Sequence, residues 1–426
     1  MSEADSRPFD LVVVGLGYVG LPLALAATEA GLLVTGLDTS ERTVASINGE
    51  RSLIDDVSDK ELSVALAAGF SATTDAGVIS DARAVVVCVP TPLARNRRPD
   101  LSAVISAMGS VRDHLQPGTT VVLESTTYPG TTDGEVRETL EESGLIAGRD
   151  FFLAFSPERV DPGNSRFGVR NTPKVVGGID EESTAAAVAL YERFIDLVVP
   201  VTSAREAEMT KLLENTFRHV NIAMVNEFAQ VCHGLGINVW ECIDAASTKP
   251  FGFMPFYPGP GVGGHCIPID PHYLAHAVRR QLDRDVQFIK LAEDVNSAMP
   301  SYVVERVERG LGAGGNRLAG ARVLLLGVTY KADIADQRQS PAVEVARCFT
   351  EQGASVSFHD PQVETWHVGH RELARVPDLA AAVREADAVV LLQAHAAYDL
   401  DRLAGFARYF FDTRGRTRPA PSVERL

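Results

Sequence analysis

The sequence has few cysteines and lacks both a long apolar run and an excess of basic charge. No apolar run reaches the ~18 residues that a membrane helix needs. Residues 1–10 lack the basic start and apolar core of a signal peptide. The scattered cysteines form no C-x-x-C pair, which argues against a disulfide framework or a zinc site and favours a reducing compartment. We therefore expect a soluble, cytoplasmic protein. The five cysteines are Cys88, Cys232, Cys242, Cys266 and Cys348.

The charge balance limits the partners. With 40 Lys and Arg against 56 Asp and Glu, the net charge is −16. A nucleic acid or an anionic membrane would require a basic face, so neither partner is expected. A small ligand with phosphates is still allowed, because helix N-termini bind such groups. At roughly 100–200 residues per domain, the 426 residues predict two or three domains.

The first ordered feature is a dinucleotide-binding pattern. Residues 11–14 are apolar and predict a buried strand, and residues 21–30 predict a helix. Between them lies Gly-Leu-Gly-Tyr-Val-Gly at 15–20, and the next predicted strand, 32–37, ends on Asp38. The glycines allow a tight turn against a pyrophosphate, and the carboxylate accepts from a ribose hydroxyl. Because Asp38 would repel a 2′-phosphate, this Rossmann pattern favours NAD over NADP.

Three further predicted strands, at residues 84–89 and 119–123 and from residue 153, each lead into a loop with hydroxyl, proline or charged residues. Open α/β sheets bind ligands at the carboxyl ends of their strands. Each of these residues has an alternative interpretation as an ordinary turn or surface residue. The candidates are Pro90, Thr91, Ser125, Thr126 and Glu158.

Residues 204–234 predict one long helix. The segment has no proline, and no glycine before Gly234, and its apolar residues recur at helical spacing. At 1.5 Å per residue the helix would be about 45 Å long, a length typical of a helix that spans two domains or forms a dimer interface. Lys211 and Asn215 share one face. A cation and an amide so placed can hold an oxyanion, or they can belong to a solvated stripe.

A glycine-rich stretch with one cysteine, Gly-Val-Gly-Gly-His-Cys-Ile-Pro-Ile-Asp at 261–270, indicates a covalent step. Glycines let the backbone approach a ligand closely, and the thiolate of Cys266 would be a strong nucleophile. Asp270 could orient a water molecule. The alternative is that Cys266 is a small buried hydrophobe. His272 and His276 have no ligand partners at metal spacing, so no metal is expected.

The last segment predicts a second α/β unit. Strands are expected at 322–327, 354–361 and 388–392, and residues 409–415 are expected to end the sheet. The segment lacks G-x-G-x-x-G, and Lys331, Arg338 and Arg414 are candidate contacts for phosphate or carboxylate. The predicted fold class is α/β, with two Rossmann-like doubly wound domains joined by a long central helix. The expected domains are an NAD-binding domain at 1–203, a central helical dimerisation region with the cysteine loop at 204–315, and a second nucleotide-binding α/β domain at 316–426, to which the resemblance given next assigns the nucleotide sugar.

Taken together, the sequence resembles the UDP-glucose/GDP-mannose dehydrogenase family over essentially its whole length. Seven motifs in a fixed order carry the resemblance. They lie at residues 15–20, 89–92, 125–126, 156–158, 211–215, 261–270 and 331–338. The motifs at 156–163 and 264–271 resemble most the branch that acts on UDP-N-acetylhexosamines, to which UDP- and dTDP-glucose dehydrogenases of sugar-tailoring pathways also belong. Ile269 stands where UDP-glucose dehydrogenases commonly have a lysine.

The resemblance implies NAD-dependent four-electron oxidation of a sugar C6 hydroxyl to the uronic acid. Cys266 would carry the thiohemiacetal and thioester, Lys211 and Asn215 would stabilise the oxyanion, and Asp270, Thr126 and Glu158 would handle water and protons. The long helix would form a homodimer. The implied cofactor-binding residues are Gly15, Gly17, Tyr18, Val19, Gly20, Asp38, Pro90, Thr91, Ser125 and Arg338. The implied substrate-binding residues are Glu158, Lys211, Asn215, Tyr257, Gly261, Lys331 and Arg414.

Two alternatives remain beside this interpretation. A two-electron NAD-dependent hydroxyacid or 6-phosphogluconate-type dehydrogenase shares the Rossmann domain and the long helix, but it needs neither a nucleophilic thiol nor a third α/β domain. A non-catalytic NAD-binding protein would be expected to have lost Cys266, Lys211 or Asn215, and all three are present. The sequence leaves open the sugar (glucose, N-acetylglucosamine or N-acetylmannosamine) and the base (UDP or dTDP).

Overall fold

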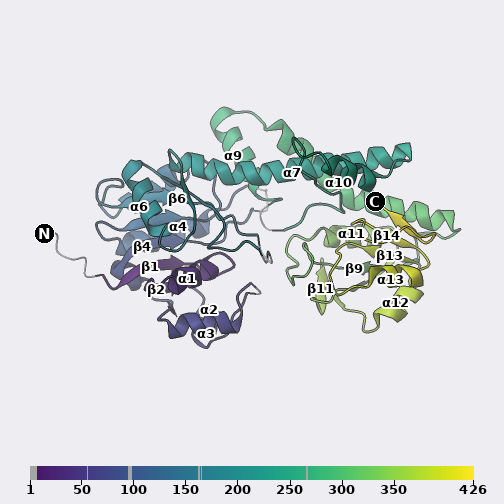
Figure 1. The fold of residues 1–426 in the computed structure, drawn as a ribbon, viewed down its shortest axis with the longest axis horizontal. Helices are drawn as coiled ribbons and strands as arrows, with labels where there is room; N and C mark the ends of the chain where they lie inside the picture. The colour runs from purple at the N-terminus through teal and green to yellow at the C-terminus, as the bar shows by residue number, and fades with distance from the viewer. Residues whose placement is uncertain (1–6, 55, 95–97, 162–163, 165, 265–266) are drawn as a thin grey trace. The chain divides into compact units, whose positions relative to one another are not determined.

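The computed structural model describes residues 7–54, 56–94, 98–161, 164, 166–264 and 267–426 (Figure 1). The chain forms two compact units. The first comprises Met1–Glu214 and His272–Asp283, and the second comprises Asn215–Pro271 and Arg284–Leu426. Two helices, α7 (Ala204–Leu235) and α9 (Asp270–Leu282), begin in one unit and end in the other. None of the described helices is long and apolar enough to cross a membrane.

The first unit is built on an eight-stranded sheet of order β3-β2-β1-β4-β5-β6-β7-β8. All neighbouring strands are parallel except β6 and β7, which are antiparallel. The central strands are rich in β-branched residues and are buried on both faces, as the predicted parallel sheet requires. The strands are β1 (Phe9–Val14), β2 (Val34–Leu37), β3 (Ser71–Thr73), β4 (Ala82–Val87), β5 (Thr120–Leu123), β6 (Phe152–Phe155), β7 (Lys174–Gly178) and β8 (Val198–Pro200).

Helices cover both faces of this sheet, and an apolar cluster fills each face. Leu11 and Val13 point into one cluster, and Val12 and Val14 into the other, as the twofold alternation of a strand dictates. The helices are α1 (Gly20–Glu29), α2 (Glu41–Asn48), α3 (Asp59–Ala67), α4 (Ser102–His114), α5 (Arg137–Glu141) and α6 (Glu181–Tyr191), with short turns η1 (Ala76–Asp81) and η2 (Thr132–Val136). The predicted Rossmann architecture is confirmed.

The second unit has a parallel sheet of order β10-β9-β13-β14-β15. The expectation that residues 409–415 end the sheet is wrong, because β15 pairs with β14 and adds an edge strand. A hairpin, β11 with β12, is separate from the sheet. The strands are β9 (Arg322–Leu326), β10 (Ser355–His359), β11 (Thr365–Val368), β12 (Arg371–Ala374), β13 (Ala388–Leu391), β14 (Phe410–Asp412) and β15 (Val423–Arg425).

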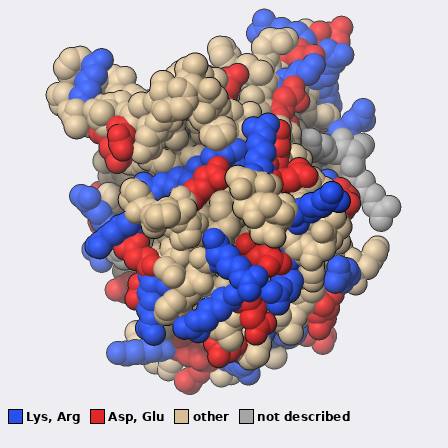
Figure 2. Space-filling model, turned by 90° about the vertical axis from the view of Figure 1, so that its right-hand side faces the viewer, with Lys and Arg blue, Asp and Glu red and all other residues tan. Residues whose placement is uncertain are grey.

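The helices of the second unit pack on this sheet and on the second part of α7. They are α8 (Val239–Ser247), α10 (Gln287–Ala313), α11 (Pro341–Glu351), α12 (Leu379–Glu385) and α13 (Leu400–Phe406). The largest apolar cluster joins residues of α7, α8, α10 and α11 to the inner face of the sheet. On the face seen in Figure 2, Lys and Arg side chains are interspersed with Asp and Glu, so positive and negative charges alternate there.

Helix α7 is unbroken over 32 residues, which confirms the predicted long helix. Its exposed apolar residues lie within an arc of about 100° when successive residues are placed 100° apart. Glu208, Lys211 and Asn215 lie on the opposite side of the helix. We call the exposed set the apolar stripe. It consists of Met209, Leu213, Phe217, Met224, Phe228, Val231 and Leu235, which are 40–68% exposed.

Candidate active site

The turn between β1 and α1 has the geometry of a dinucleotide-binding turn. Gly15 has a φ of +92°, and a Cβ on it would lie 2.7 Å from the carbonyl oxygen of Cys88. A Cβ on Gly20 would lie 1.9 Å from the oxygen of Gly15, whereas one on Gly17 would meet nothing within 4 Å. Two glycines therefore close the turn and the third leaves open space at the start of α1. This arrangement fits a bound pyrophosphate.

Asp38 at the end of β2 stabilises the same turn. Its Oδ2 accepts a hydrogen bond from the backbone N–H of Leu16 at 2.9 Å, and its Oδ1 accepts from that of Ser40, also at 2.9 Å. The carboxylate therefore lies beside the glycine turn, and its remaining lone pairs can accept from a ribose. Tyr18 and Val19 belong to the turn itself, and Tyr18 is 36% exposed. The residues of this turn thus fit NAD.

The loops after β4 and β5 lie next to each other. The Ser125 hydroxyl donates to the oxygen of Val89 at 2.8 Å and thereby ties the two loops together. The Tyr273 hydroxyl on α9 donates to the oxygen of Thr91 at 3.0 Å. Pro90 is exposed, whereas Thr91 and Thr126 are buried. The predicted hydroxyl residues at these two strand ends therefore belong to one edge of the sheet.

Glu158, in the loop after β6, belongs to a buried ionic cluster that sequence reasoning did not find. Lys174 Nζ lies 3.0 Å from Glu124 Oε1 and 3.9 Å from Glu158 Oε2. The Tyr191 hydroxyl donates to Glu124 Oε1, and Lys174 Nζ lies 4.9 Å from the centre of the Tyr191 ring. The side chains of Glu124, Lys174 and Glu158 are only 0%, 7% and 13% exposed. The interpretation of Glu158 as an ordinary surface residue is therefore wrong.

The ionisation of this cluster follows from burial and from its charges. Burial raises the pKa of Glu124, although Lys174 and Tyr191 favour its ionised form. Burial disfavours the ammonium of Lys174, but the two carboxylates outweigh that effect and the pKa of Lys174 is raised. Burial, together with Glu124, raises the pKa of the neighbouring Cys88 thiol well above its usual value. Lys174 is therefore a cation at neutral pH and Cys88 is a neutral thiol.

Lys211 is buried on α7, one turn after a second residue that sequence reasoning missed. Glu208 accepts from the backbone N–H groups of Gly130 (2.7 Å) and Thr132 (2.9 Å) and from the Thr132 hydroxyl (2.7 Å). Burial raises the pKa of Glu208 to about 7. Glu208 therefore attaches the loop that follows Thr126 to the helix that carries Lys211. Only its position near Lys211 in the sequence could have drawn attention to it.

In the second unit the structure brings together two predicted catalytic residues that are 55 positions apart. Asn215 Nδ2 on α7 donates to Oδ2 of Asp270, the first residue of α9, at 2.5 Å. Asp270 is 1% exposed. Lys211 lies one turn before Asn215 on α7, as the i,i+4 spacing predicts. Cys266, the predicted nucleophile, lies outside the described residues.

The glycine stretch before Cys266 packs against the segment that begins at Tyr330. A Cβ on Gly264 would lie 2.9 Å from the Tyr330 ring, and one on Gly261 would lie 3.1 Å from Cβ of Pro341. Lys331 and Arg338 lie in the segment between Tyr330 and Pro341, so the structure brings two predicted motifs together. Arg338 forms an ion pair with Asp336 at 2.6 Å.

A second group of predicted substrate residues meets at the end of β14. The Arg414 Nε donates to the oxygen of Leu392 at 2.6 Å, and a Cβ on Gly259 would lie 2.9 Å from its Nη1. Tyr257 stacks on Trp240 with ring centres 6.2 Å apart. Burial lowers the pKa of Arg414 to about 10, so its guanidinium stays charged at neutral pH. Arg414 and the loop 257–261 therefore form one cationic, aromatic edge.

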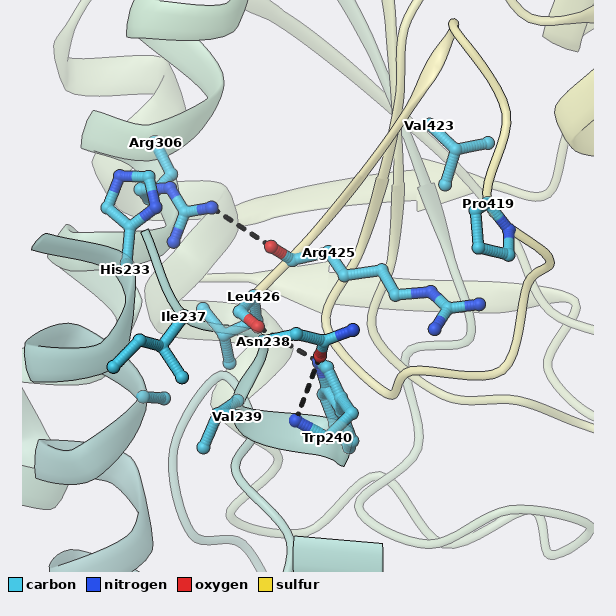
Figure 3. Close-up of a pocket in the computed structure, with 11 residues that line it drawn as sticks. His233, Ile237, Asn238, Val239, Trp240, Arg306, Pro419, Val423, Arg425 and Leu426 are labelled. Atoms are coloured by element: carbon cyan, nitrogen blue, oxygen red, sulfur yellow. Dashed lines mark hydrogen bonds between the residues drawn. The ribbon is translucent and has the colours of Figure 1, made fainter. Parts of the chain in front are cut away.

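A cavity of about 250 Å³ in the second unit lies apart from the predicted site residues, between residues of α7, α8 and α10 and the C-terminal strand β15 (Figure 3). Arg306 donates to the oxygen of Arg425 there, and the Trp240 indole donates to the oxygen of Leu426. None of the described residues predicted for the site lines this cavity. Among the described residues there is also no cluster of three or more His, Cys, Asp or Glu side chains that could hold a metal ion.

Comparison with known proteins identifies relatives over nearly the whole chain. The chain is 34% identical over 394 residues to a UDP-N-acetyl-D-mannosamine dehydrogenase of Methanocaldococcus jannaschii, covering 91% of this chain and 86% of that one. It is 35% identical over 426 residues to an NDP-N-acetyl-D-galactosaminuronic acid dehydrogenase of Ralstonia solanacearum, covering 97% of each chain. A UDP-D-ManNAc dehydrogenase structure from Pyrococcus horikoshii superposes with a TM-score of 0.89 at 32% identity, covering 98% of this chain and 99% of that one.

Three consecutive sequence models of one family match this chain. The NAD binding domain matches residues 9–195, the central domain matches residues 205–298 and the UDP binding domain matches residues 324–419. The first match, together with the glycine turn and Asp38, identifies NAD as the cofactor. The relatives that act on N-acetylated sugars agree with the branch that the motifs resemble. The chain belongs to the UDP-glucose/GDP-mannose dehydrogenase family.

Proposed function

We propose that this protein oxidises the C6 hydroxyl of a UDP-N-acetylhexosamine to the carboxylate, with two NAD consumed per sugar. The family and the named substrates of the relatives support the sugar class. The single observation that carries the proposal is the Asn215–Asp270 hydrogen bond. It joins the amide proposed to stabilise the oxyanion to the carboxylate of Asp270, which lies four residues after the proposed nucleophile, Cys266, in the sequence. The family match disfavours a two-electron hydroxyacid dehydrogenase.

Bound NAD would supply the hydride acceptor for the two oxidations. The turn at 15–20 and Asp38 would hold it, together with the tied loops that carry Thr91 and Ser125. The exposed Tyr18 and Pro90 and the adjacent Val19 border the same edge. Because Asp38 is a carboxylate, it would repel the 2′-phosphate of NADP.

The proposed chemistry balances through two successive covalent intermediates on Cys266. The alcohol loses a hydride and a proton to give an aldehyde, and the thiolate of Cys266 adds to its carbonyl carbon as a thiohemiacetal. Loss of a second hydride and a proton gives a thioester, and water then displaces the thiol. Overall, one alcohol, two NAD⁺ and one water give one carboxylate, two NADH and three protons.

Each remaining residue has a role that its chemistry suits. The buried ammonium of Lys211 and the amide of Asn215 would stabilise the oxyanions on the path. Asp270, Thr126 and Glu158 would exchange protons with the substrate and with the attacking water. Arg414, Lys331, Tyr257 and Gly261 would hold the nucleotide, since a guanidinium and an ammonium bind phosphate oxygens and an aromatic ring stacks on a base.

We also propose that the protein is a homodimer whose subunits meet along the apolar stripe of α7. The stripe leaves seven apolar side chains at least 40% exposed along one helix. A contiguous apolar surface of this kind marks an interaction site. A second copy of the same helix has a matching stripe, which a twofold interface requires.

The decisive test is the NADH yield per sugar consumed. We would compare UDP-glucose, dTDP-glucose, UDP-N-acetylglucosamine, UDP-N-acetylmannosamine and UDP-N-acetylgalactosamine as substrates for the wild type, Cys266→Ser and the control Cys242→Ser, which changes an exposed free cysteine. We expect about two NADH per sugar, with an N-acetylated substrate far ahead. Cys266→Ser should lose this turnover and Cys242→Ser should keep it. A yield of one NADH, or an active Cys266→Ser, would contradict the thioester route.

A further inference from the structure

The buried cluster around Lys174 lies at the edge of the sheet where the proposed chemistry takes place. Glu124 follows β5 directly and Glu158 follows β6 by three residues. Strand β7 runs antiparallel to β6, with Phe155 opposite Gly177. This register, continued by three residues, puts Lys174 opposite Glu158. The first residue of β7 therefore lies beside the carboxyl ends of β5 and β6.

Lys174 has contacts that hold its ammonium in one place. Glu124 Oε1 lies 3.0 Å from Nζ and also accepts from the Tyr191 hydroxyl. The Tyr191 ring lies 4.9 Å from Nζ, on the same side chain whose hydroxyl binds Glu124. Glu124 and Tyr191 together therefore fix the cation, since neither side chain is exposed to solvent.

Glu158 is the less enclosed of the two carboxylates. Its Oε1 accepts from the backbone N–H of Val160 at 2.5 Å, and its Oε2 faces Lys174 at 3.9 Å. At this distance the contact is an ion pair rather than a hydrogen bond. In a region of low dielectric it still favours the ionised carboxylate and opposes its rotation out of the cluster.

We propose that Lys174 is a positioning residue, whose ammonium, held by Glu124 and Tyr191, fixes the Glu158 carboxylate at the catalytic edge of the sheet. The inference rests on the proposed function, which gives Glu158 its role with water and protons. Lys174 itself would touch neither substrate nor cofactor. The competing interpretation is a purely structural ion pair between β5 and β7.

The variant that separates these interpretations is Lys174→Met combined with Glu124→Gln. Lys174→Met alone would leave Glu124 buried without a counter-ion, which destabilises proteins strongly. The combined variant removes the Glu124 charge together with that of Lys174, so only Glu158, the less enclosed carboxylate, loses its ion pair. The glutamine retains an oxygen for the Tyr191 hydroxyl. The control is Arg193→Met. It removes an ion pair with Asp10, which lies near the amino end of β1 in the same sheet.

We expect the combined variant to lower kcat by about 10- to 100-fold and to change KM for the nucleotide sugar by less than about threefold. Adding Glu158→Gln should lower kcat no further, because Lys174 acts through that carboxylate. Amide hydrogen exchange in residues 152–161, measured without NAD, should be faster in the combined variant and unchanged in the Arg193→Met control.

Several outcomes would overturn the inference. An unchanged kcat, multiplicative losses when Glu158→Gln is added, or unchanged exchange in residues 152–161 would each show that Lys174 does not position Glu158. Full activity of Glu158→Gln alone would show that the reaction does not need the Glu158 carboxylate, so Lys174 would have no catalytic group to position. Turnover of a nucleotide sugar by the wild type would still support the proposed function. If the wild type oxidises no nucleotide sugar, the proposed function fails, and the exchange measurement alone decides whether Lys174 holds the loop.

Discussion

Asn215 donates a hydrogen bond to Asp270 across 2.5 Å, and so a helix residue and the first residue of another helix share one polar contact. Asp270 is buried, and this amide helps to orient its carboxylate. A buried carboxylate that accepts this hydrogen bond suits the proton-transfer role proposed for Asp270.

We predict that Asp270→Asn lowers kcat by at least about 100-fold, because an amide cannot take up a proton. The exchange Asn215→Asp with Asp270→Asn should restore the hydrogen bond and the unfolding temperature but not kcat, because the carboxylate has moved to the other helix. The measurements are steady-state kinetics and thermal unfolding. Asn221→Ala, on the same helix, should leave kcat unchanged. An exchanged pair with wild-type kcat would show that the position of the carboxylate is unimportant.

The local patterns in the sequence predicted much of the NAD-binding edge. The Gly15–Gly20 turn, Asp38 and the buried central strands follow from spacing and apolar runs, because each depends on residues close in sequence. The 32-residue helix α7 could also be predicted from the sequence, because its interior has no proline and no glycine before Gly234. The pairing of Asn215 with Asp270 is different, because local spacing cannot bring together residues 55 positions apart.

The parts that were not predicted depend on topology and burial. Lys174 begins a strand, and it lies beside the carboxyl ends of β5 and β6 only because β7 runs antiparallel to β6. Glu208 belongs to none of the motifs, and its acceptor role depends on a loop 76 to 78 positions away. Strand β15 at residues 423–425 is three residues long, too short for its alternation to indicate a strand. The roles of Lys331, Arg338 and Arg414 in ligand binding stay predictions.

Glu208 makes the stability of the protein depend on pH. Its pKa is about 7 in the folded protein, against 4.5 for an ordinary glutamate, because it is buried. Between these values the folded state binds more protons, so the free energy of unfolding falls as pH rises through about 7. The loss corresponds to about 3 kcal/mol.

The test compares urea unfolding of the wild type and Glu208→Gln from about pH 5 to about pH 8. The variant should be less stable at low pH, because its amide would face the N–H of Gly130. The difference between the two proteins should shrink as pH rises, since only the wild type loses stability through this group. Parallel pH profiles would contradict the prediction.

The apolar stripe predicts the effect of charge on assembly. Leu213 is 64% exposed and Phe228 is 57% exposed. Burying such a side chain contributes about 1.5–3 kcal/mol, so Leu213→Glu with Phe228→Glu should raise the dimer dissociation constant by at least about 100-fold. Sedimentation equilibrium measures this constant. Arg218→Glu, at an exposed position of α7 outside the stripe, is the control and should leave the dimer intact. A double variant that stays dimeric would place the interface elsewhere.

Alanine substitutions at two glycines of the NAD turn should affect different properties, namely stability at Gly20 and NAD affinity at Gly17. A Cβ on Gly20 would lie 1.9 Å from the oxygen of Gly15, so Gly20→Ala should destabilise the protein by about 1–3 kcal/mol or more. A Cβ on Gly17 meets nothing within 4 Å, so Gly17→Ala should unfold at nearly the wild-type temperature. Its affinity for NAD should nevertheless fall by more than about tenfold, because the methyl group would occupy the space where the pyrophosphate approaches the backbone.

Calorimetric titration with NAD, beside differential scanning calorimetry, distinguishes the two effects. Gly109→Ala is a matched control, because Gly109 lies in α4 and its Cβ would also meet nothing within 4 Å. This control should keep both NAD affinity and stability. If Gly17→Ala binds NAD as tightly as the control does, the turn is not the pyrophosphate site. If Gly20→Ala is as stable as the wild type, the backbone of the turn must move to accept the methyl group. The contact between Gly15 and Gly20 would then be less rigid than the 1.9 Å separation implies.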